Sequence, residues 1–404
     1  MRKIDPFNLL RLVYTCGPLS RTDLAEKAKV APSYVSAIVS QAQARGLILE
    51  SGFVPSRGGR RRILLGMNPG LAQLVGIDIG RRYIRIVVTD FVGKILDCKS
   101  LSSETFKAKE HLLHVVHEAL KSLLRQQPAV AAIGLSSSGV IDQQSGTLLF
   151  WPQVSGWEDT PLKAIFEGEY GLPTVIEDEV RAMARIEQRF GHGKDVRNFV
   201  FVYVGMGIGA AIFIDGRLCA WRDGLAGELG HATVEENGKL CSCGNRGCLE
   251  LYSSAAAIVE RVRAELDYGV NSSLAGEADK NLDHLNVEDI AAAAQSHDRL
   301  AERVLREAGT HLGTALASVV NLLNPEKIVL AGKVPQAAPE TYVDSLLYNL
   351  RQRAFPRSVK GLDVVVSQSG DEAAAVGAAL LAGNEVLKAC CQEMEGKSSS
   401  RESG

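Results

Sequence analysis

Two segments of the chain share one pattern of strands and turns, and this repetition limits the folds open to it. Residues 74–96 have the sequence LVGIDIGRRYIRIVVTDFVGKIL, and residues 199–218 have the sequence FVFVYVGMGIGAAIFIDGRL. Each runs from an apolar strand through a glycine turn into a second apolar strand and an Asp-containing turn. Helical stretches such as 109–124 alternate with strands, so we expect a duplicated α/β unit.

The length and composition indicate a globular protein of several domains. A chain of 404 residues exceeds what one hydrophobic core usually serves. The first residues lack the layout of a signal peptide, and no apolar run approaches the ~20 residues that span a bilayer. We therefore expect a cytoplasmic protein with no membrane partner.

The charge is distributed unevenly along the chain. Residues 1–66 contain 11 Lys or Arg against 4 Asp or Glu, a net charge of about +7, whereas the whole chain carries −2. A basic head on an acidic body indicates nucleic-acid binding, and a solvated charged face is the alternative.

The basic head contains a pattern typical of a helix-turn-helix. Residues 19–48 predict two short helices, and the second begins near Pro32 and ends at Gly46. Its outward positions are short or polar, as a helix entering the major groove requires: Ser33, Tyr34, Ser36, Ser40 and Gln41. An earlier helix over residues 7–14 would complete a three-helix core.

A hairpin wing is predicted after this motif. A Gly-Gly turn at 58–59 is flanked by Arg57, Arg60 and Arg61, which can reach the minor groove and the phosphates together. The alternative is a helical protein-interaction module with a basic linker. The arginines favour double-stranded DNA as the partner.

A cluster of potential metal ligands follows the second glycine turn. His231, Cys241, Cys243 and Cys248 offer one imidazole and three thiolates, a closed set suited to structural Zn²⁺. Buried structural thiols are the alternative. With four protein ligands the metal keeps no open position, so hydrolytic chemistry is not expected.

Two carboxylates flank this loop. Glu228 precedes His231 by three residues, and Glu250 follows Cys248 by two. Carboxylates accept paired hydrogen bonds from vicinal hydroxyls, which makes a sugar a suitable ligand. Two solvated surface glutamates are the alternative.

These motifs together resemble the ROK family of repressors, open reading frames and sugar kinases, and in particular its transcriptional repressor branch. The resemblance covers nearly the whole chain in the same order: the winged helix, IGLSSSGVID, WPQVSGWEDTPL, GLPTVIEDEVRA, the glycine turn, GELGH, the cysteine loop and GDEAAAVGAALLA. It implies an actin-like ATPase (ribonuclease H-like) fold of two α/β lobes with a structural zinc. It also implies a homodimer or tetramer that binds a DNA operator and a sugar effector.

The expected domains follow from this resemblance. Residues 1–70 would form the winged helix-turn-helix, 71–190 the first lobe and 191–385 the second lobe with the zinc loop. Residues 386–404 are polar and low in aromatics, so we expect a disordered tail.

The resemblance also assigns the effector site. Family kinases hold their sugar with a Gly-Glu-x-Gly-His segment, which Glu228 and His231 match, and with a glutamate that Glu250 matches. Their Asn-Asp pair, whose Asp is the general base, is replaced here by Asp178 and Glu179. With Gly139, these residues form the predicted effector site: Gly139, Asp178, Glu179, Glu228, His231 and Glu250. The longer Glu179 and the added charge of Asp178 leave the sugar unidentified.

The phosphate turn departs from the kinase pattern. Family kinases have Asp-x-Gly-Gly-Thr, whereas Arg81 and Arg82 occupy the last two positions here. Met206 replaces a Thr in the second turn, and Lys333 replaces a glycine on the adenosine side. We therefore expect no ATP binding and no catalytic residues. The arginines could instead pair with the phosphate of a sugar phosphate.

The sequence thus predicts a sugar-responsive transcriptional regulator, a repressor of carbohydrate uptake or catabolism genes with an inactive kinase-like domain. An active sugar kinase with a DNA-binding head is one alternative. A regulator controlled by a partner protein is another.

Overall fold

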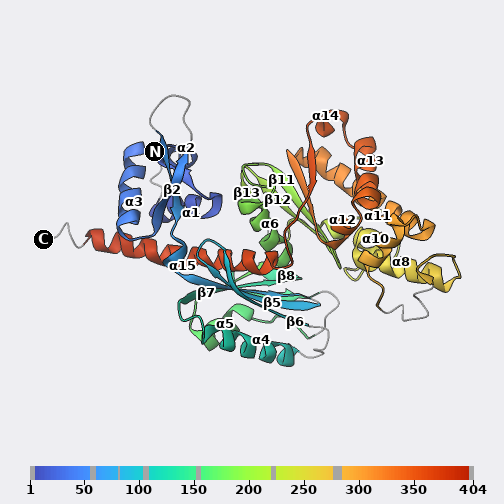
Figure 1. Ribbon diagram of the computed structural model, residues 1–404, viewed down its shortest axis with the longest axis horizontal. Coiled ribbons are helices and arrows are strands. Elements are labelled where there is room, and N and C mark those ends of the chain that lie inside the picture. Colours follow the sequence, from blue (N-terminus) through green and yellow to red (C-terminus); the bar gives the residue numbers. More distant parts are fainter. Residues whose placement is uncertain are drawn as a thin grey trace. The chain divides into compact units, whose positions relative to one another are not determined.

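The computed structural model describes residues 5–54, 61–80, 82–102, 109–151, 156–219, 224–275 and 284–399. The chain divides into two compact units, residues 1–189 with 371–404, and residues 190–370. Figure 1 shows both units, coloured along the sequence.

A winged helix opens the first unit. Its elements are α1 (Pro6–Cys16), β1 (Leu19–Ser20), α2 (Arg21–Ala28), α3 (Pro32–Ala44), β2 (Ile48–Val54) and β3 (Arg62–Met67). Ser20 and Asp23 form a capping box that starts α2, and Pro32 occupies the first turn of α3. The strands pair in the order β1-β3-β2. The predicted helix-turn-helix with a wing is confirmed.

The first lobe is built on a mixed sheet. In the described residues its strands lie in the order β10-β7-β4-β5-β6. They are β4 (Gln73–Ile79), β5 (Tyr83–Asp90), β6 (Ile95–Ser102), β7 (Val130–Ser137) and β10 (Thr174–Asp178). Helices α4 (Lys109–Leu124) and α5 (Leu162–Tyr170) share a hydrophobic cluster with one face. Helix α15 (Ala373–Ser399) packs on β4 and β7, and α6 (Glu179–Phe190) follows β10.

The second unit repeats this sheet. Its described strands lie in the order β13-β12-β11-β14-β15. They are β11 (Phe199–Val204), β12 (Ile208–Ile214), β13 (Arg217–Leu218), β14 (Lys327–Ala331) and β15 (Asp363–Val366). In both sheets the first strand pairs antiparallel with the second and parallel with the fourth. The predicted duplication is therefore confirmed.

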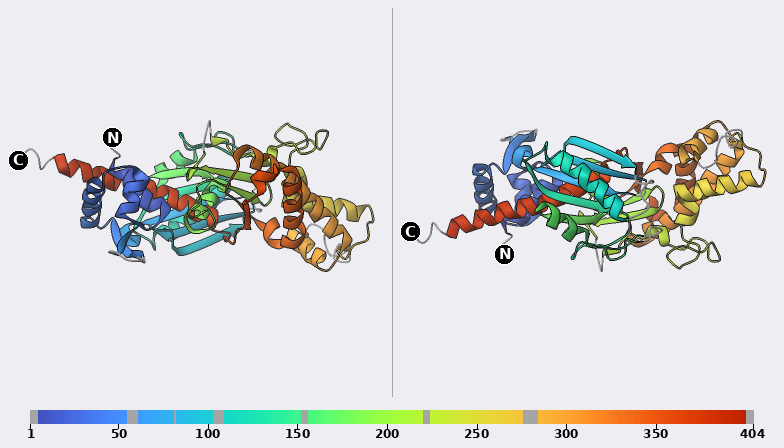
Figure 2. Two further views of the ribbon diagram at one scale, coloured as in Figure 1. Left: turned by 90° about the horizontal axis from the view of Figure 1, so that it is seen from above. Right: turned by 90° about the horizontal axis from the view of Figure 1, so that it is seen from below.

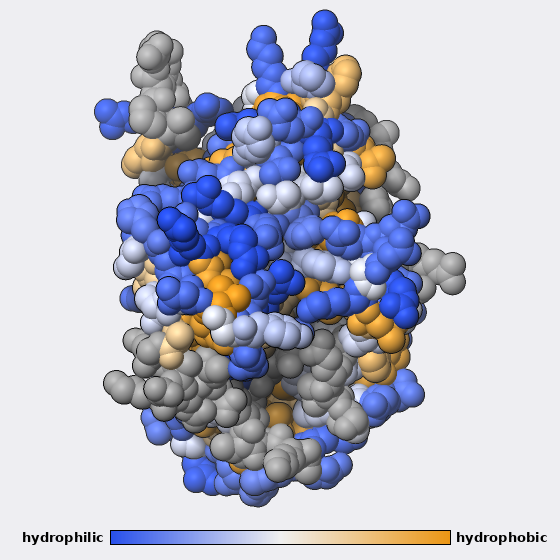
Figure 3. All heavy atoms as spheres, turned by 90° about the vertical axis from the view of Figure 1, so that its right-hand side faces the viewer, coloured by the Kyte–Doolittle hydropathy of each residue, from blue (hydrophilic) through white to orange (hydrophobic). Residues whose placement is uncertain are grey.

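Helices of the second unit share one hydrophobic cluster with one face of the second sheet. They include α7 (Glu250–Ser253), α8 (Ala255–Asp267), α10 (Val287–Gln295), α11 (Arg299–Leu323), α12 (Lys333–Ala337), α13 (Asp344–Arg353) and α14 (Pro356–Val359). Figure 3 views the side on which most of these helices are drawn in Figure 1, and hydrophilic residues cover most of the face that is coloured.

The end of the chain differs from the sequence prediction. Residues 371–385 belong to the first unit and not to the second lobe. Helix α15 continues to Ser399, so a disordered tail from residue 386 is wrong for 386–399. Leu387, Cys391 and Met394 recur at helical spacing and are buried against the winged helix, which orders this segment. Figures 1 and 2 show α15 running from the first sheet to the winged helix.

Helix α15 is also long and apolar enough to cross a membrane. Within the described part of the chain, the segment Ala373–Glu395 meets that criterion, but 61% of its apolar window is buried inside the protein. A core helix has this property, and α15 packs on β4 and β7.

The hydrophobic core of the winged helix is continuous with that of the first lobe. One cluster joins Leu10 and Val39 of the winged helix to Leu74 and Phe91 of the first lobe and to Leu380 of α15. The expected separate domain over residues 1–70 is therefore part of the first compact unit.

Candidate functional site

Helix α3 presents a polar face to solvent. Ser33, Ser36 and Gln41 are exposed as predicted, whereas Val35 and Val39 are fully buried. Ser40 is exposed as well. Small and polar exposed side chains on a helix supported by a packed core suit contact with base edges.

Tyr34 departs from this prediction. Its side chain is half-buried and packs against the hydrophobic cluster of the winged helix. Burial, with Asp5 and Glu395 nearby, raises the pKa of its hydroxyl. Arg45, which the sequence analysis missed, is exposed at the C-cap of α3. Its spacing of four from Gln41 could have revealed it, because positions i and i+4 share a helix face.

The wing is described in part. Arg57 and Arg60 lie outside the described residues, and Arg61 is exposed. Arg62 begins β3, and its Nη1 lies 3.1 Å from Asp23 Oδ1 of α2. This ion pair joins the base of the wing to the helix-turn-helix.

The second unit contains the predicted metal-ligand group. The donor atoms of His231, Cys241, Cys243 and Cys248 all lie within 4.8 Å of one another. Cys241 Sγ is 3.6 Å from His231 Nδ1, and Cys243 Sγ is 3.6 Å from Cys248 Sγ. One imidazole and three thiols this close together are a donor set suited to a tetrahedral metal ion.

A glycine makes this loop possible. Gly247 has φ +70°, and a Cβ there would lie 1.7 Å from Glu235 O. Any side chain would push the two arms of the loop apart. The glycine therefore lets Cys248 approach the other ligands.

Glu250 contacts two of the four potential metal ligands. Its Oε1 lies 3.4 Å from Cys241 Sγ and 3.6 Å from His231 Nδ1, at the start of α7. Glu228 precedes the 3-10 turn η3 (Leu229–His231). The second unit thus places both predicted effector glutamates next to the ligand loop.

In the first unit, Glu179 begins α6 beside the end of β7. Ser138, which the sequence analysis did not single out, donates a hydrogen bond to Glu179 Oε2. Gly139 follows with φ +120°, and a Cβ there would lie 2.5 Å from Phe150 O. No sequence rule pairs Ser138 with Glu179, because 41 residues separate them.

A second carboxylate lies buried close to Glu179. Asp78 Oδ1 accepts a 2.9 Å hydrogen bond from Ser136 Oγ. Burial and the Glu179 carboxylate raise the pKa of Asp78 well above its usual value, and Arg85 opposes this shift. Burial also raises the pKa of Glu179, against the Ser138 hydrogen bond and Arg85.

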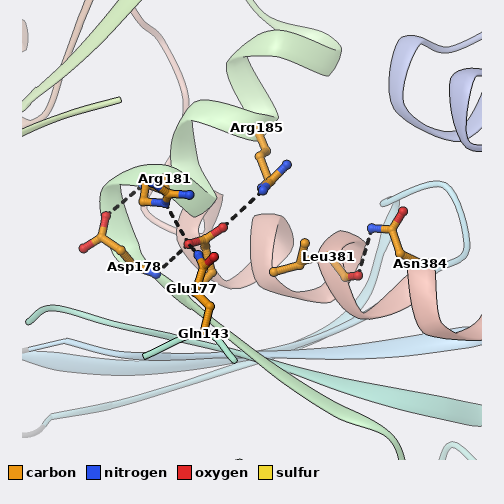
Figure 4. Close-up of polar contacts among 7 residues, drawn as sticks. All are labelled: Gln143, Glu177, Asp178, Arg181, Arg185, Leu381 and Asn384. Carbon is orange, nitrogen blue, oxygen red and sulfur yellow. Dashed lines mark hydrogen bonds and ion pairs between the residues drawn. The ribbon is translucent and has the colours of Figure 1, made fainter. Parts of the chain in front are cut away.

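Glu177 anchors the start of α6 (Figure 4). Its Oε1 lies 2.8 Å from Arg181 Nε, its Oε2 lies 3.2 Å from Arg185 Nη2, and Gln143 donates to it from the turn after β8 (Val140–Asp142). Asp178 Oδ1 accepts from the backbone N–H of Arg181 at 3.0 Å. Asp178 Oδ1 therefore accepts a hydrogen bond from a backbone N–H in the first turn of α6.

Comparison with known proteins identifies the family of this chain. The ROK family model matches residues 74–385. This protein belongs to the ROK family. A ROK family transcriptional regulator of solved structure, described as a homologue of the Escherichia coli MLC protein, superposes with a TM-score of 0.79 at 30% identity, over 96% of this chain and 98% of its own.

Two curated relatives cover the same length. A xylose repressor from Caldicellulosiruptor bescii is 29% identical over 391 residues, which are 96% of this chain and 97% of the relative. An N-acetylglucosamine repressor from Escherichia coli is 32% identical over 394 residues, which are 96% and 94% of the two chains. The similarity to both repressors therefore includes the winged helix.

Proposed function

We propose that this ROK protein is a sugar-responsive transcriptional repressor of carbohydrate uptake or catabolism genes. The observation that carries the proposal is the exposed polar face of α3 on a winged helix that shares one hydrophobic core with a sugar-kinase-like lobe. The DNA contacts are assigned to Ser33, Ser36, Gln41 and Arg45, with Arg57, Arg60 and Arg61 on the wing. Such a regulator acts in the cytoplasm.

The effector is a monosaccharide or its derivative. The resemblance to family kinases assigns sugar contacts within each unit by itself: Gly139, Asp178 and Glu179 in the first, and Glu228, His231 and Glu250 in the second. Hydroxyl groups of a sugar donate to these carboxylates in pairs. The relatives are named for xylose and for N-acetylglucosamine, so both sugars belong in the first set of trials.

The chain is not expected to transfer phosphate. Lys333 begins α12 and its Nζ lies 3.2 Å from Glu288 Oε1, so an ion pair stands where family kinases have a glycine. Arg82 lies in the turn between β4 and β5, and Met206 lies in the turn between β11 and β12. Arg81 lies outside the described residues. Large side chains at these positions leave little room for nucleotide phosphates.

His231, Cys241, Cys243 and Cys248 would hold one structural Zn²⁺. The ion would supply fixed geometry to the loop and no open coordination position for chemistry. The four protein ligands would then keep Glu250 in place beside them. We further propose a homodimer or tetramer, because paired winged helices contact two operator half-sites.

DNA selection tests the function. Duplexes that bind the full chain would be enriched from a random pool, and the affinity of the enriched duplex measured between about 50 and 200 mM salt. We expect a steep fall in affinity with salt, and release by D-xylose, N-acetylglucosamine or one of their phosphates. Absence of any enriched duplex, or an affinity independent of salt, contradicts the proposal.

Two controls separate the alternatives. Sugar-dependent ATP turnover that Glu179→Gln abolishes would identify an active kinase. Release of the duplex by a lysate of sugar-grown cells, but by none of the purified sugars, would identify control by a partner protein.

A further inference from the structure

Tyr14 of α1 is the point at which the winged helix meets three elements of the first lobe. Its hydroxyl donates a 2.7 Å hydrogen bond to Leu380 O of α15. Its ring centroid lies 5.0 Å from that of Phe91 after β5, and Arg189 Cζ of α6 lies 4.7 Å from the ring centroid. The side chain is almost fully buried. Tyr14 therefore contacts α15, the β5–β6 turn and α6 at once.

The contact with α15 leaves no free space. A Cβ on Gly383 would lie 2.0 Å from the Tyr14 hydroxyl oxygen and 2.8 Å from its Cζ. The tyrosine therefore rests directly on the backbone of α15, and glycine is required beneath it.

Each of the three elements also reaches the Asp78 and Glu179 carboxylates or a residue that contacts them. Helix α6 begins at Glu179 and carries Arg189 ten residues later, a rise of about 15 Å. Strand β5 carries Arg85, which acts on both Asp78 and Glu179, and it ends immediately before Phe91.

Helix α15 makes the third connection. Asp371, two residues before its start, lies with Oδ2 3.0 Å from Arg85 Nη2. The same helix then reaches Leu380 beneath Tyr14. Strand β5, helix α6 and helix α15 therefore each run from the region of Arg85, Asp78 and Glu179 to the contacts of Tyr14.

These elements are packed backbone to backbone. A Cβ on Gly76 of β4 would lie 1.8 Å from Ala375 O, and one on Gly134 of β7 would lie 1.9 Å from Ala378 O. A Cβ on Gly377 of α15 would lie 2.1 Å from Ala182 O of α6. Such close packing deforms little, so a displacement at one end is transmitted to the other.

We infer that Tyr14 is the positioning residue that couples the Asp78–Glu179 carboxylates to the DNA-reading helix. This inference rests on the proposed function and names its route of regulation. Helix α1 shares its core with Val35 and Val39 of α3. A shift of α6 or α15 against Tyr14 therefore reorients α3 together with α1.

A double-mutant cycle tests this coupling. Glu179→Gln replaces the ionisable carboxyl at one end by a neutral amide, and Tyr14→Phe removes the hydroxyl at the other without loss of ring packing. We expect Glu179→Gln to change the Kd of the enriched duplex about fivefold or more in the wild-type background. In the Tyr14→Phe background the change should fall below about twofold.

Tyr170→Phe is the matched control. Tyr170 lies in the same unit and its hydroxyl is 2.7 Å from His117 Nδ1, remote in sequence from the Tyr14 contacts. In this background Glu179→Gln should retain its full effect. An effect of equal size in the wild-type and Tyr14→Phe backgrounds, or none in the wild type, overturns the inference.

A measurement without DNA separates this inference from the proposed function. Hydrogen exchange of residues 6–16 and 32–44 should respond to Glu179→Gln in the wild-type chain and lose this response in Tyr14→Phe. If no duplex is enriched but this pattern appears, the proposed function fails and the coupling stands. If exchange responds equally in both backgrounds, the coupling is refuted.

Discussion

Arg181 Nε lies 2.8 Å from Glu177 Oε1, and both side chains are almost completely buried at the start of α6. Without Arg181 the buried Glu177 carboxylate would keep only the partly exposed Arg185 of these two cations, and a buried charge that loses a partner is costly. Arg181→Met should therefore lower the free energy of unfolding by about 3 kcal/mol. Denaturant unfolding measures this loss.

Arg185 provides the comparison for this prediction. It contacts the same glutamate, but its side chain is 33% exposed. Arg185→Met should cost about 1 kcal/mol or less, because water screens the exposed pair. Equal losses of unfolding free energy in Arg181→Met and Arg185→Met would show that burial of the arginine does not set the strength of its ion pair with Glu177.

Gly134→Ala should destabilise the first lobe. The added methyl group would lie 1.9 Å from Ala378 O, and backbone on both sides must shift to admit it. We expect a loss of about 2 kcal/mol or more. Gly168→Ala is the control: it lies on α5 with no atom within 4 Å of the new methyl group, so stability should stay constant or rise. A thermal melt distinguishes the two results.

Asp78→Asn should stabilise the protein at neutral pH. Because burial raises the pKa of Asp78 in the folded state, the folded chain holds that proton more tightly than the unfolded chain does. Stability is then lost as pH rises from about 4 through the raised folded pKa. The asparagine carries no charge and does not cause this loss. The gain in free energy of unfolding of Asp78→Asn over the wild type should therefore shrink as pH falls.

Denaturant unfolding at acidic and neutral pH measures this difference. Asp142 is the control with the opposite sign, since hydrogen bonds from Ser145 and from the backbone of Gln144 lower the pKa of its carboxyl. Asp142→Asn should give no gain at neutral pH. A gain for Asp78→Asn that is independent of pH would contradict the assigned cause.

Cys243→Ser should lower both zinc content and stability. Elemental analysis of the purified wild-type chain should give about one zinc per chain, and a chelator should lower its Tm. Cys98→Ser replaces another exposed cysteine outside the ligand group and should leave zinc unchanged. Full zinc in Cys243→Ser would refute this residue as a ligand.

Arg45→Gln should weaken duplex binding and reduce its dependence on salt. If Arg45 contacts a phosphate, the slope of log affinity against log salt should fall by about 1. Arg125→Gln removes an exposed arginine of the first lobe and should leave the slope unaltered. Unchanged binding in Arg45→Gln would remove this residue from the DNA contacts.

Local patterns predicted much of this architecture. The spacing of Val35 and Val39 located the inner face of α3, and the glycine turns located both strand pairs, because these features depend on neighbouring residues. The grouping of His231 with the three cysteines also followed from a short loop.

Features that depend on distant partners escaped prediction. Tyr34 is drawn inward by a cluster to which α15 contributes, and Ser138 meets Glu179 only after β7 and β10 pair. The order of residues 386–399 likewise arises from packing on a winged helix more than 300 residues earlier in the chain. Hydropathy along one segment carries no information about such partners.

The shared core of the winged helix and first lobe has a consequence for how such regulators diversify. A foreign DNA-binding head grafted onto this lobe would meet α15 with mismatched side chains at Leu387, Cys391 and Met394. New operator preferences are therefore more accessible by substitution on the outer face of α3 than by exchange of the head. Substitutions in the winged helix and in the second half of α15 are therefore coupled, although more than 300 residues separate the two segments in the chain.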